Sequence, residues 1–179
     1  MNVKYTAGAL LLLLASTICA FGQEARLTDA QIVGILLVAN QAEIAAGQTA
    51  LRRSQSRSIQ SFASRMVDEH GQVNQETAEL MRRLAATPQR SAASDALTQQ
   101  SYDDLARLNA VEAREFDQAY LDREVIFLQQ LVKSVDAFIP ATQNAELKVL
   151  LVRSRPSFIF HLDQAHRLQL ALERPGYGR

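Results

Sequence analysis

The chain has 179 residues, 19 basic and 19 acidic side chains, and a net charge of zero, which excludes the basic excess typical of nucleic-acid-binding proteins. We therefore expect no nucleic-acid partner. With only 7 glycines and 4 prolines, and 47% hydrophobic residues, the composition predicts a helix-rich chain that is long enough for one domain with a sizeable core.

Residues 1–22 have the pattern of a cleavable secretory signal peptide. Lys4 precedes an apolar run, and small side chains at Ala20 and Gly22 follow that run. The pattern predicts a periplasmic or secreted protein, whose mature part, residues 23–179, forms a single domain.

The cysteine content agrees with an exported protein that lacks disulfides. Ile18 is bulky at the position where a lipoprotein signal needs a small residue, so we expect Cys19 to be removed with the leader rather than acylated. The mature chain then contains no cysteine, and its stability must come from packing. No later segment is expected to be long and apolar enough to span a membrane, so we expect no stable membrane insertion after cleavage.

Four long helices are predicted after the leader, because apolar residues recur there at spacings of three and four. A shorter helix is expected within the connection between the second and the third of them. The expected ranges are 29–54, with Thr28 as its cap, 57–86, 113–138 and 144–173 for the long helices, and 95–108 for the short helix within the connection 87–112.

Three prolines are expected to limit these helices. Pro88 should end the second helix, Pro140 should end the third, and Pro156 should kink or divide the fourth. Two helical hairpins joined by a long connection predict an all-α fold, a ferritin-like four-helix bundle with one crossover.

Several short motifs, taken in their order along the chain, resemble the DUF4142 family. The resemblance covers about residues 30–172 and implies an exported bacterial protein with a ferritin-like four-helix fold. The family is named for its unknown function, so the resemblance implies no activity. Its members often carry a histidine in the third helix, near the position where this chain has Leu128. The motifs are Ala39-Asn40-x-x-Glu43, Gly47, Phe62-Ala63-x-x-Met66-Val67-x-x-His70, Phe116-Asp117-x-Ala119-Tyr120-Leu121 and Pro156-x-x-x-x-His161-Leu162.

Each long helix carries one polar residue near the middle of its apolar stripe. A rise of about 1.5 Å per residue places all four residues at mid-bundle. Two carboxylates and two imidazoles could together bind one divalent transition metal, such as zinc, copper, iron or manganese. A di-iron centre is not expected, because its paired Glu-x-x-His motifs are missing. The candidate ligands are Glu43, His70, Glu124 and His161.

The interpretation that we favour from the sequence is a buried hydrogen-bond network without a metal. Buried polar groups need partners, so we expect direct Glu43–His70 and Glu124–His161 pairs that fix the register of the helices. Asp117 and Tyr120 are candidates to extend the network, although Asp117 also suits the start of a helix. We expect Asp68 and Glu69 to be surface charges and Met66 to fill the core.

Two classes of function remain open from the sequence. The first is a non-enzymatic module of the cell envelope or of a stress response, which acts through an unidentified protein partner. The second is a metal-binding protein, with redox chemistry as one option. A hydrolase fits least, because His161 and His166 are five residues apart, whereas a zinc-peptidase motif needs a spacing of four. We predict no catalytic residue, and the sequence does not indicate an oligomeric state.

Overall fold

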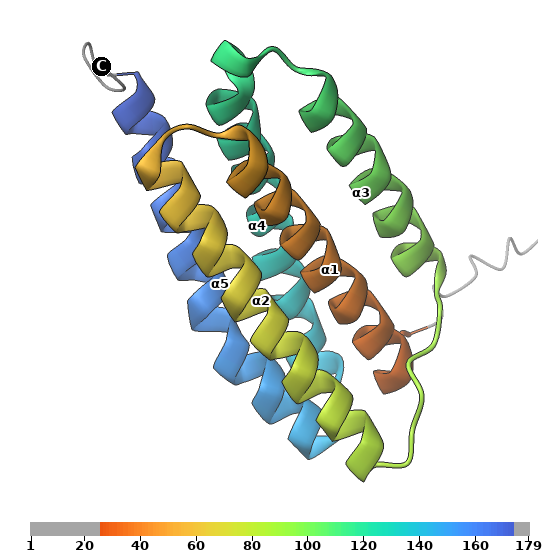
Figure 1. Cartoon of the computed structure of the whole chain (residues 1–179). Coiled ribbons are helices and arrows are strands. Elements are labelled where there is room, and N and C mark those ends of the chain that lie inside the picture. Colours follow the sequence, from red (N-terminus) through yellow and green to blue (C-terminus); the bar gives the residue numbers. More distant parts are fainter. Residues whose placement is uncertain (1–25, 174–179) are drawn as a thin grey trace, which may run out of the picture.

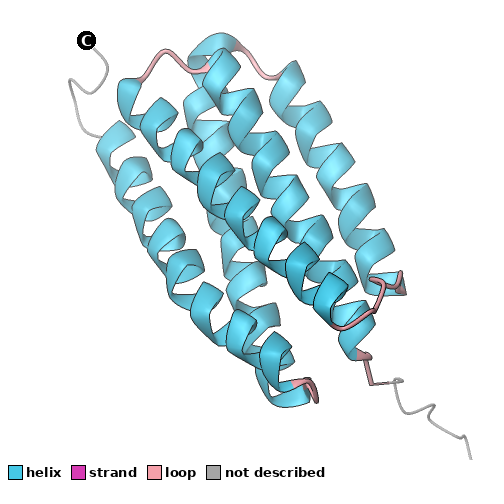
Figure 2. Cartoon of the chain, turned by 60° about the horizontal axis from the view of Figure 1, so that its bottom comes forward, coloured by secondary structure: helices cyan, strands magenta, loops and turns pink. Residues whose placement is uncertain are grey.

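The fold is an all-helical bundle, seen in a computed structural model that describes residues 26–173. Four helices form the bundle, and a fifth helix, α3, lies outside it against α1 (Figures 1 and 2). The predicted signal peptide and its cleavage site lie outside the described residues. The elements are α1 (Asp29–Arg53), α2 (Arg57–Arg83), α3 (Ala92–Ala110), the 3-10 turn η1 (Ala113–Glu115), α4 (Phe116–Ala141) and α5 (Ala145–Leu172).

The connectivity is that of a ferritin-like bundle. The α1–α2 and α4–α5 pairs form helical hairpins, and α3 carries the chain back along the length of the bundle between them (Figure 1). Because of this crossover, α4 runs in the same direction as α2 and α5 in the same direction as α1 (Figure 1). The predicted fold class is therefore confirmed, including the long connection between the second and third bundle helices.

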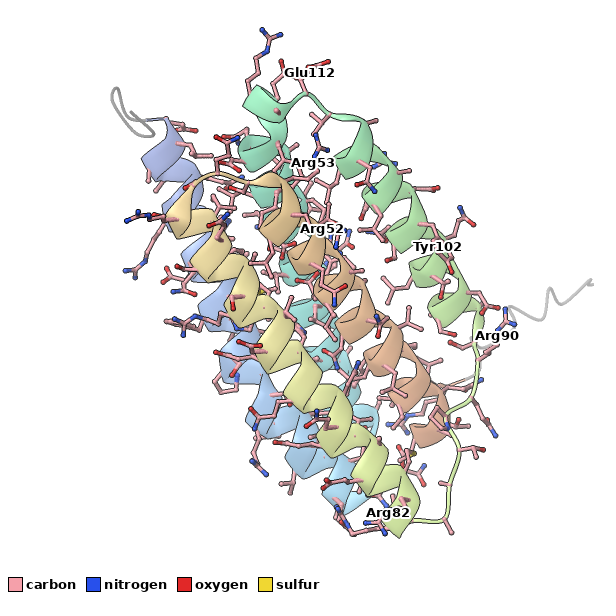
Figure 3. All side chains as sticks on the ribbon, viewed as in Figure 1. Arg52, Arg53, Arg82, Arg90, Tyr102 and Glu112 are labelled. Carbon is pink, nitrogen blue, oxygen red and sulfur yellow. The ribbon has the colours of Figure 1, made fainter. Side chains whose placement is uncertain are left out.

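The predicted apolar stripes form the core. At least one large side chain from each stripe is no more than 1% exposed, including Leu36, Met66, Leu128 and Leu151. Charged side chains, including Arg52, Arg82 and Arg90, extend from the outside of the bundle (Figure 3). The helical period of the sequence thus predicts the inward face of every bundle helix correctly.

The first helix is apolar enough to raise the question of a membrane span. Among the described residues, α1 is the one helix whose length and composition would allow it to cross a membrane, with a mean hydropathy of 1.3. The prediction that no such segment follows the leader is wrong by this measure. Because 61% of the apolar window is buried and α1 contacts α2, α3 and α4, its composition is that of a core helix.

Both ends of α1 also hold neighbouring loops. The side chain of Thr28 accepts a hydrogen bond from the Gln31 backbone, and the Gln31 side chain accepts one from the Thr28 backbone, which forms a capping box. At the other end, the Arg53 guanidinium donates to the carbonyl oxygens of Leu108 and Val111. Arg53 therefore ties the end of α3 to the end of α1.

Several predicted helix boundaries differ from the structure by a few residues, and local features account for two of them. α3 begins at Ala92 rather than at 95, because Ser91 and Ser94 form a capping box there. α4 continues past Pro140, which lies in its last turn and does not end it.

Pro156 was predicted to kink or divide the fourth helix; the division is wrong, since α5 runs unbroken through Pro156, and the kink stays a prediction. Proline leaves the carbonyl group of Val152, one turn earlier, without its helical donor. Both Pro156 and Val152 lie on the exposed face of α5, where water can satisfy that carbonyl group. The helix therefore tolerates this proline at lower cost than it would on the buried face.

α2 ends at Arg83, three residues earlier than predicted, in a Schellman motif. The backbone N–H of Ala86 donates to the Met81 carbonyl at 3.0 Å, and that of Ala85 donates to the Arg82 carbonyl at 3.3 Å. Ala85 has a φ of 49°, in the left-handed region that favours glycine.

Replacing Ala85 with glycine should stabilise the protein by about 1 kcal/mol, because it removes the strain of a side chain at positive φ. Urea unfolding followed by circular dichroism would measure the change. Ala86→Gly, at the next position, is the matched control and should not stabilise. A loss of stability in Ala85→Gly would contradict the Schellman assignment.

The connection between α2 and α3 crosses α1 at Gly34. The backbone N–H of Gln89 donates to the Ala30 carbonyl at 2.9 Å, so this segment lies directly on α1. A Cβ atom at Gly34 would clash with the carbonyl oxygen of Gln89, whereas a Cβ atom at Gly71 would meet no atom within 4 Å. Only the first of these glycines is required by packing.

Gly34→Ala should therefore destabilise the protein by about 1–3 kcal/mol, as overpacking against backbone does. Gly71→Ala, in the middle of α2, should instead stabilise it by about 0.5–1 kcal/mol through helix propensity. Chemical denaturation of both variants tests the pair. Equal effects of the two substitutions would mean that the crossover does not pack on α1 as described.

Candidate functional site

The four polar residues predicted at mid-bundle are all fully buried. Glu43 on α1, His70 on α2, Glu124 on α4 and His161 on α5 are each 0% exposed. Their inward direction is confirmed, but their contacts divide them into two groups. A carboxylate cluster lies between α1 and α4, and a histidine pair lies between α2 and α5.

The carboxylate cluster consists of Glu43, Glu124 and Arg123. The Nη1 group of Arg123 donates to Glu43 Oε1 and, at 2.9 Å, to Glu124 Oε1. The Arg123 side chain is only 7% exposed, and its Cζ atom lies 4.1 Å from the centre of the Phe127 ring. One buried guanidinium therefore holds both carboxylates.

One guanidinium cannot neutralise two carboxylates, and the pKa values of the two glutamates diverge accordingly. Burial opposes the ionisation of Glu43, but the charge of Arg123, with smaller contributions from its neighbours, lowers the pKa of Glu43. Burial, together with the nearby negative charge of Glu43, raises the pKa of Glu124 well above its usual range. Within the cluster, Glu124 therefore holds a proton more readily than Glu43, whose ionised form is favoured by Arg123.

The predicted direct pairs Glu43–His70 and Glu124–His161 are wrong. Arg123 takes both carboxylates because a guanidinium offers charged donors, which bind carboxylates more strongly than a neutral imidazole does. The histidines use other acceptors.

The histidine pair consists of His70 and His161, and each ring has one nitrogen held by an acceptor. His70 Nδ1 lies 2.8 Å from Asn40 Oδ1, and His161 Nε2 lies 2.9 Å from Glu69 Oε2. An amide oxygen and a carboxylate only accept, so these two ring nitrogens carry the protons. When the rings are neutral, His70 Nε2 and His161 Nδ1 therefore each present a lone pair.

Both rings are neutral at pH 7. Burial lowers the pKa of His70 to about 4, although the nearby Glu43 opposes this shift. Burial also lowers the pKa of His161, against the opposing effect of Glu69. The two ring centres are 5.3 Å apart, and the His70 ring stacks on Phe158 at 5.2 Å.

The two lone-pair nitrogens have no hydrogen-bond partner among the residues that the structure describes. His70 Nε2 and His161 Nδ1 are both buried without one. A buried polar atom without a partner is rare and is typically explained by water, an ion or a chemical role. The histidine pair thus presents two neutral nitrogen atoms to which the described residues supply no partner.

Three residues of this core were missed or misplaced from the sequence. Arg123 was not predicted to be buried, and Asn40 was not predicted to bind His70. Glu69, predicted as a surface charge, is only 35% exposed at its side chain and holds His161, whereas Asp68 is exposed as predicted. The pairing predicted from the sequence gave two buried carboxylates only neutral imidazoles as partners, and this imbalance of charge could have indicated that a buried cation was missing from the prediction.

The two residues that were expected to extend the network make no hydrogen bond to it within the described part of the chain. Tyr120 is fully buried and stacks on Phe116, with its ring 6.2 Å from that of Phe116. Within residues 26–173, its hydroxyl has no hydrogen-bond partner, and Asp117 forms neither a hydrogen bond nor an ion pair. Asp117 lies in the first turn of α4, which agrees with its predicted place at the start of the helix.

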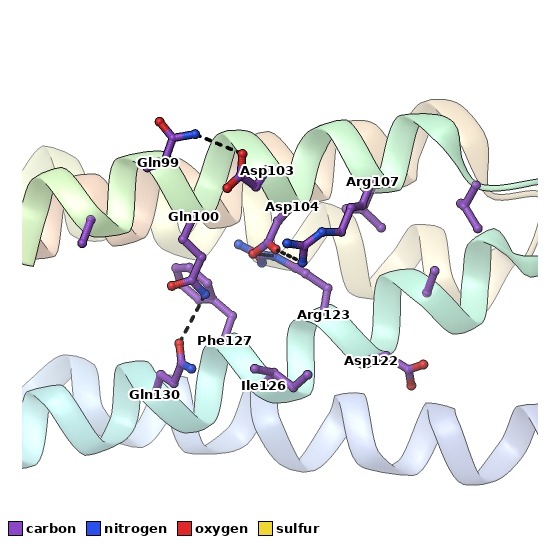
Figure 4. A pocket seen from close by; sticks show the side chains of 14 residues that line it. Gln99, Gln100, Asp103, Asp104, Arg107, Asp122, Arg123, Ile126, Phe127 and Gln130 are labelled. Atoms are coloured by element: carbon purple, nitrogen blue, oxygen red, sulfur yellow. Dashed lines mark hydrogen bonds and ion pairs between the residues drawn. The ribbon is translucent and has the colours of Figure 1, made fainter.

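Two cavities reach the polar core from outside. A cavity of about 330 Å³ between α2 and α5 is lined by Glu69, Glu76 and His161, among others. A larger one, of about 860 Å³, lies between α3 and α4 and reaches Arg123 (Figure 4). Its walls approach each other at the hydrogen bond between Gln100 and Gln130 (Figure 4).

The four candidate metal ligands are not brought together as one set. Across the described part of the chain, no group of three or more His, Cys, Asp or Glu side chains is placed to hold a metal ion. Arg123 binds one oxygen each of Glu43 and Glu124, and the second oxygens of both carboxylates have no hydrogen-bond partner among the described residues. The neutral donor atoms without a partner at the histidine pair are His70 Nε2 and His161 Nδ1. In chemical terms, the core offers two neutral nitrogen ligands.

Comparison with known proteins gives one finding. A family model described as "Domain of unknown function (DUF4142)" matches residues 18–168. No curated protein and no solved structure shows significant similarity to the chain.

Proposed function

The chain belongs to the DUF4142 family, whose description assigns no activity, and from the geometry of its core we propose that it binds a transition-metal ion through His70 and His161. The observation that carries this proposal is the state of the histidine pair. Each ring is neutral, has its N–H held by an acceptor, and keeps a buried lone pair free.

This state matches the way in which proteins prepare histidine for a metal. A ligating histidine donates its other N–H to a carboxylate, a carbonyl or water, which fixes the tautomer and orients the ring. Glu69 has this role for His161, and the amide oxygen of Asn40 has it for His70. Because neither ring is protonated at pH 7, no proton has to be displaced before a metal binds.

The spacing of the rings also suits a shared ion. Metal–nitrogen bonds of about 2.0–2.1 Å keep two imidazole centres that share an ion within roughly 6.5 Å of each other. The observed separation of 5.3 Å lies within that limit. Imidazole nitrogen suits zinc, copper, iron and nickel.

Metal content tests the proposal. The protein is purified from its native compartment without an affinity tag, and its metal is measured by mass spectrometry. We expect about one ion per chain in wild type, and its loss in His70→Ala and His161→Ala. His166→Ala removes the remaining histidine, on the outer side of α5, and should keep the ion. Metal that persists in both core variants would contradict the proposal.

A second candidate is the non-enzymatic, exported module that acts through protein contacts. The specific observation in its favour is an apolar surface on α5, which the sequence pattern did not reveal, and the signal-peptide pattern supports export. Arg123 also bridges one oxygen of each buried carboxylate, as a structural core network would. The exposed apolar residues of α5 are Val149, Val152, Ile159, Phe160 and Leu170.

Cross-linking in intact cells tests this second candidate. Wild type should give a defined adduct with another protein, and Val152→Lys combined with Ile159→Lys should abolish it. Tyr102→Lys is the matched control, because Tyr102 is a single exposed aromatic side chain on α3, away from α5 (Figure 3). Loss of the adduct in the control as well would argue against a contact surface on α5.

A further inference from the structure

We infer that the ion held by His70 and His161 is a soft monovalent cation, Cu⁺ in the cell, which reaches the histidine pair through the cavity between α2 and α5. This inference rests on the proposed function and adds the class of ion and its route. The number of ligands, the charge balance, the surroundings of the rings and the cavity each support it.

The number of free ligands favours an ion of low coordination number. The core provides two nitrogen donors, and among residues 26–173 no third His, Cys, Asp or Glu side chain is placed to join them. Zinc in structural sites takes four protein ligands, and calcium and magnesium take six or more oxygens. Cu⁺ and Ag⁺, in contrast, form stable complexes with only two nitrogen donors in a nearly linear arrangement, which the two rings reach when their centres move about 1 Å farther apart than 5.3 Å.

The charge balance favours a single positive charge. Glu43 and Glu124 each have one oxygen bound by the guanidinium of Arg123, so the negative charge of this cluster already has a cationic partner. The one carboxylate in contact with the histidine pair is Glu69, which binds His161 and also forms an ion pair with Arg65 at 3.7 Å. Because these carboxylates already have cationic partners, an ion of low charge is favoured: a divalent ion would have roughly four times the desolvation penalty of a monovalent one, since that penalty grows with the square of the charge.

The surroundings of the histidine pair are apolar and soft. The His70 ring is stacked on Phe158, with the planes only 9° apart. Met66 lies one helical turn before His70 on the same buried face of α2 and is 0% exposed. Thioether and imidazole groups suit Cu⁺, whereas the hard cations prefer oxygen.

The cavity of about 330 Å³ between α2 and α5 provides an entry path. Its lining has two carboxylates, Glu69 and Glu76, against one cation, Arg153, and it reaches His161. Glu69 belongs both to this lining and to the histidine pair, through its hydrogen bond to His161. We therefore assign Glu69 as a positioning residue that also faces the entering ion.

The inference is tested with the metal-free full mature chain in chloride-free buffer. Ag⁺ serves as the redox-stable probe for Cu⁺, and Zn²⁺ is the divalent comparison, each added at one equivalent per chain. We expect Ag⁺ to bind at 1:1 by native mass spectrometry and to raise the melting temperature, and Zn²⁺ to do neither. His161→Gln should abolish both effects of Ag⁺, whereas His166→Ala should retain them.

Glu69→Gln should weaken the affinity for Ag⁺ by about 10- to 100-fold, as the loss of a carboxylate behind a ligating histidine does. Glu76 lines the same cavity but contacts neither histidine, so Glu76→Gln should weaken the affinity for Ag⁺ less than Glu69→Gln does. Side-chain ¹⁵N spectra of His161 report the tautomer of the ring directly. We expect the ring to lose its single tautomer in Glu69→Gln, whereas a merely structural role of Glu69 would leave the spectra unchanged.

The outcomes separate the two proposals. Binding of Zn²⁺ at the same histidines, without any effect of Ag⁺, would overturn the assignment of a monovalent ion and leave the proposed function intact. The absence of binding by both ions would overturn both. An effect of Ag⁺ that survives in His161→Gln but disappears in His166→Ala would show that the ion binds on the outer surface instead.

Discussion

Arg123→Met is expected to destabilise the protein by about 3–5 kcal/mol, the usual effect of removing one partner from a buried ion pair. The substitution leaves Glu43 and Glu124 in the core without their shared donor, while methionine fills a similar volume. Glu43 must then either remain as an uncompensated buried charge or take up a proton. Guanidinium denaturation followed by circular dichroism at pH 7 measures the loss.

The control is the triple variant Arg123→Met, Glu43→Gln and Glu124→Gln. The triple variant keeps methionine at position 123 but replaces both glutamates, so no uncompensated carboxylate remains in the core. We expect it to regain at least half of the stability lost in the single variant, because replacing a whole buried ion pair is often close to neutral. A single variant within 1 kcal/mol of wild type would mean that Arg123 does not bridge the two carboxylates in solution.

Glu124→Gln is expected to have the opposite effect, and to stabilise the protein increasingly as the pH rises. The pKa of Glu124 is raised in the folded state by burial and by the charge of Glu43. A raised pKa means that the folded protein binds the proton more tightly than the unfolded chain does. The stability from this group is therefore fully present below the unfolded pKa of 4.5 and is lost as the pH rises through the folded value.

Glutamine keeps the shape and the hydrogen-bonding capacity of a protonated glutamate and has no proton to lose. The advantage of Glu124→Gln over wild type should therefore be small at pH 4 and should grow by up to about 1.4 kcal/mol per pH unit above 4.5. Urea denaturation at several pH values between 4 and 8 measures this slope.

Glu43→Gln is the contrasting variant, because the pKa of Glu43 is lowered and its ionised form stabilises the fold. That variant should be less stable than wild type at pH 7, and its deficit should shrink toward low pH. A difference between Glu124→Gln and wild type that does not depend on pH would contradict the assignment of the proton to Glu124.

The directions of the core side chains could be predicted from the sequence, and most of their partners could not. Periodicity states which face of a helix is buried, and it placed Glu43, His70, Glu124 and His161 inside correctly. It does not state how far a long side chain reaches. Arg123 is adjacent to Glu124 in the sequence and therefore off the stripe, yet its length brings the guanidinium back to the core.

Glu69 and Asn40 show the same limit. Each lies beside a stripe rather than within it, and the period alone assigns such positions to the boundary of the buried face. Glu69 reaches His161 on a different helix, ninety-two residues later in the chain, so its role depends on how α2 and α5 pack. The crossover over Gly34 was equally beyond the sequence pattern, since a glycine within a helix does not indicate which segment packs against it.

The central claim is that His70 and His161 are neutral, with defined tautomers and free lone pairs that bind a metal. Long-range ¹H–¹⁵N spectra of the histidine side chains test it directly, because the chain contains only 3 histidines and His166 serves as the internal reference. At pH 7 we predict the Nδ1–H tautomer for His70 and the Nε2–H tautomer for His161. On addition of one equivalent of Ag⁺, the signals of His70 Nε2 and His161 Nδ1 should shift, and those of His166 should not. Protonated rings, the opposite tautomers, or a shift confined to His166 would contradict the account.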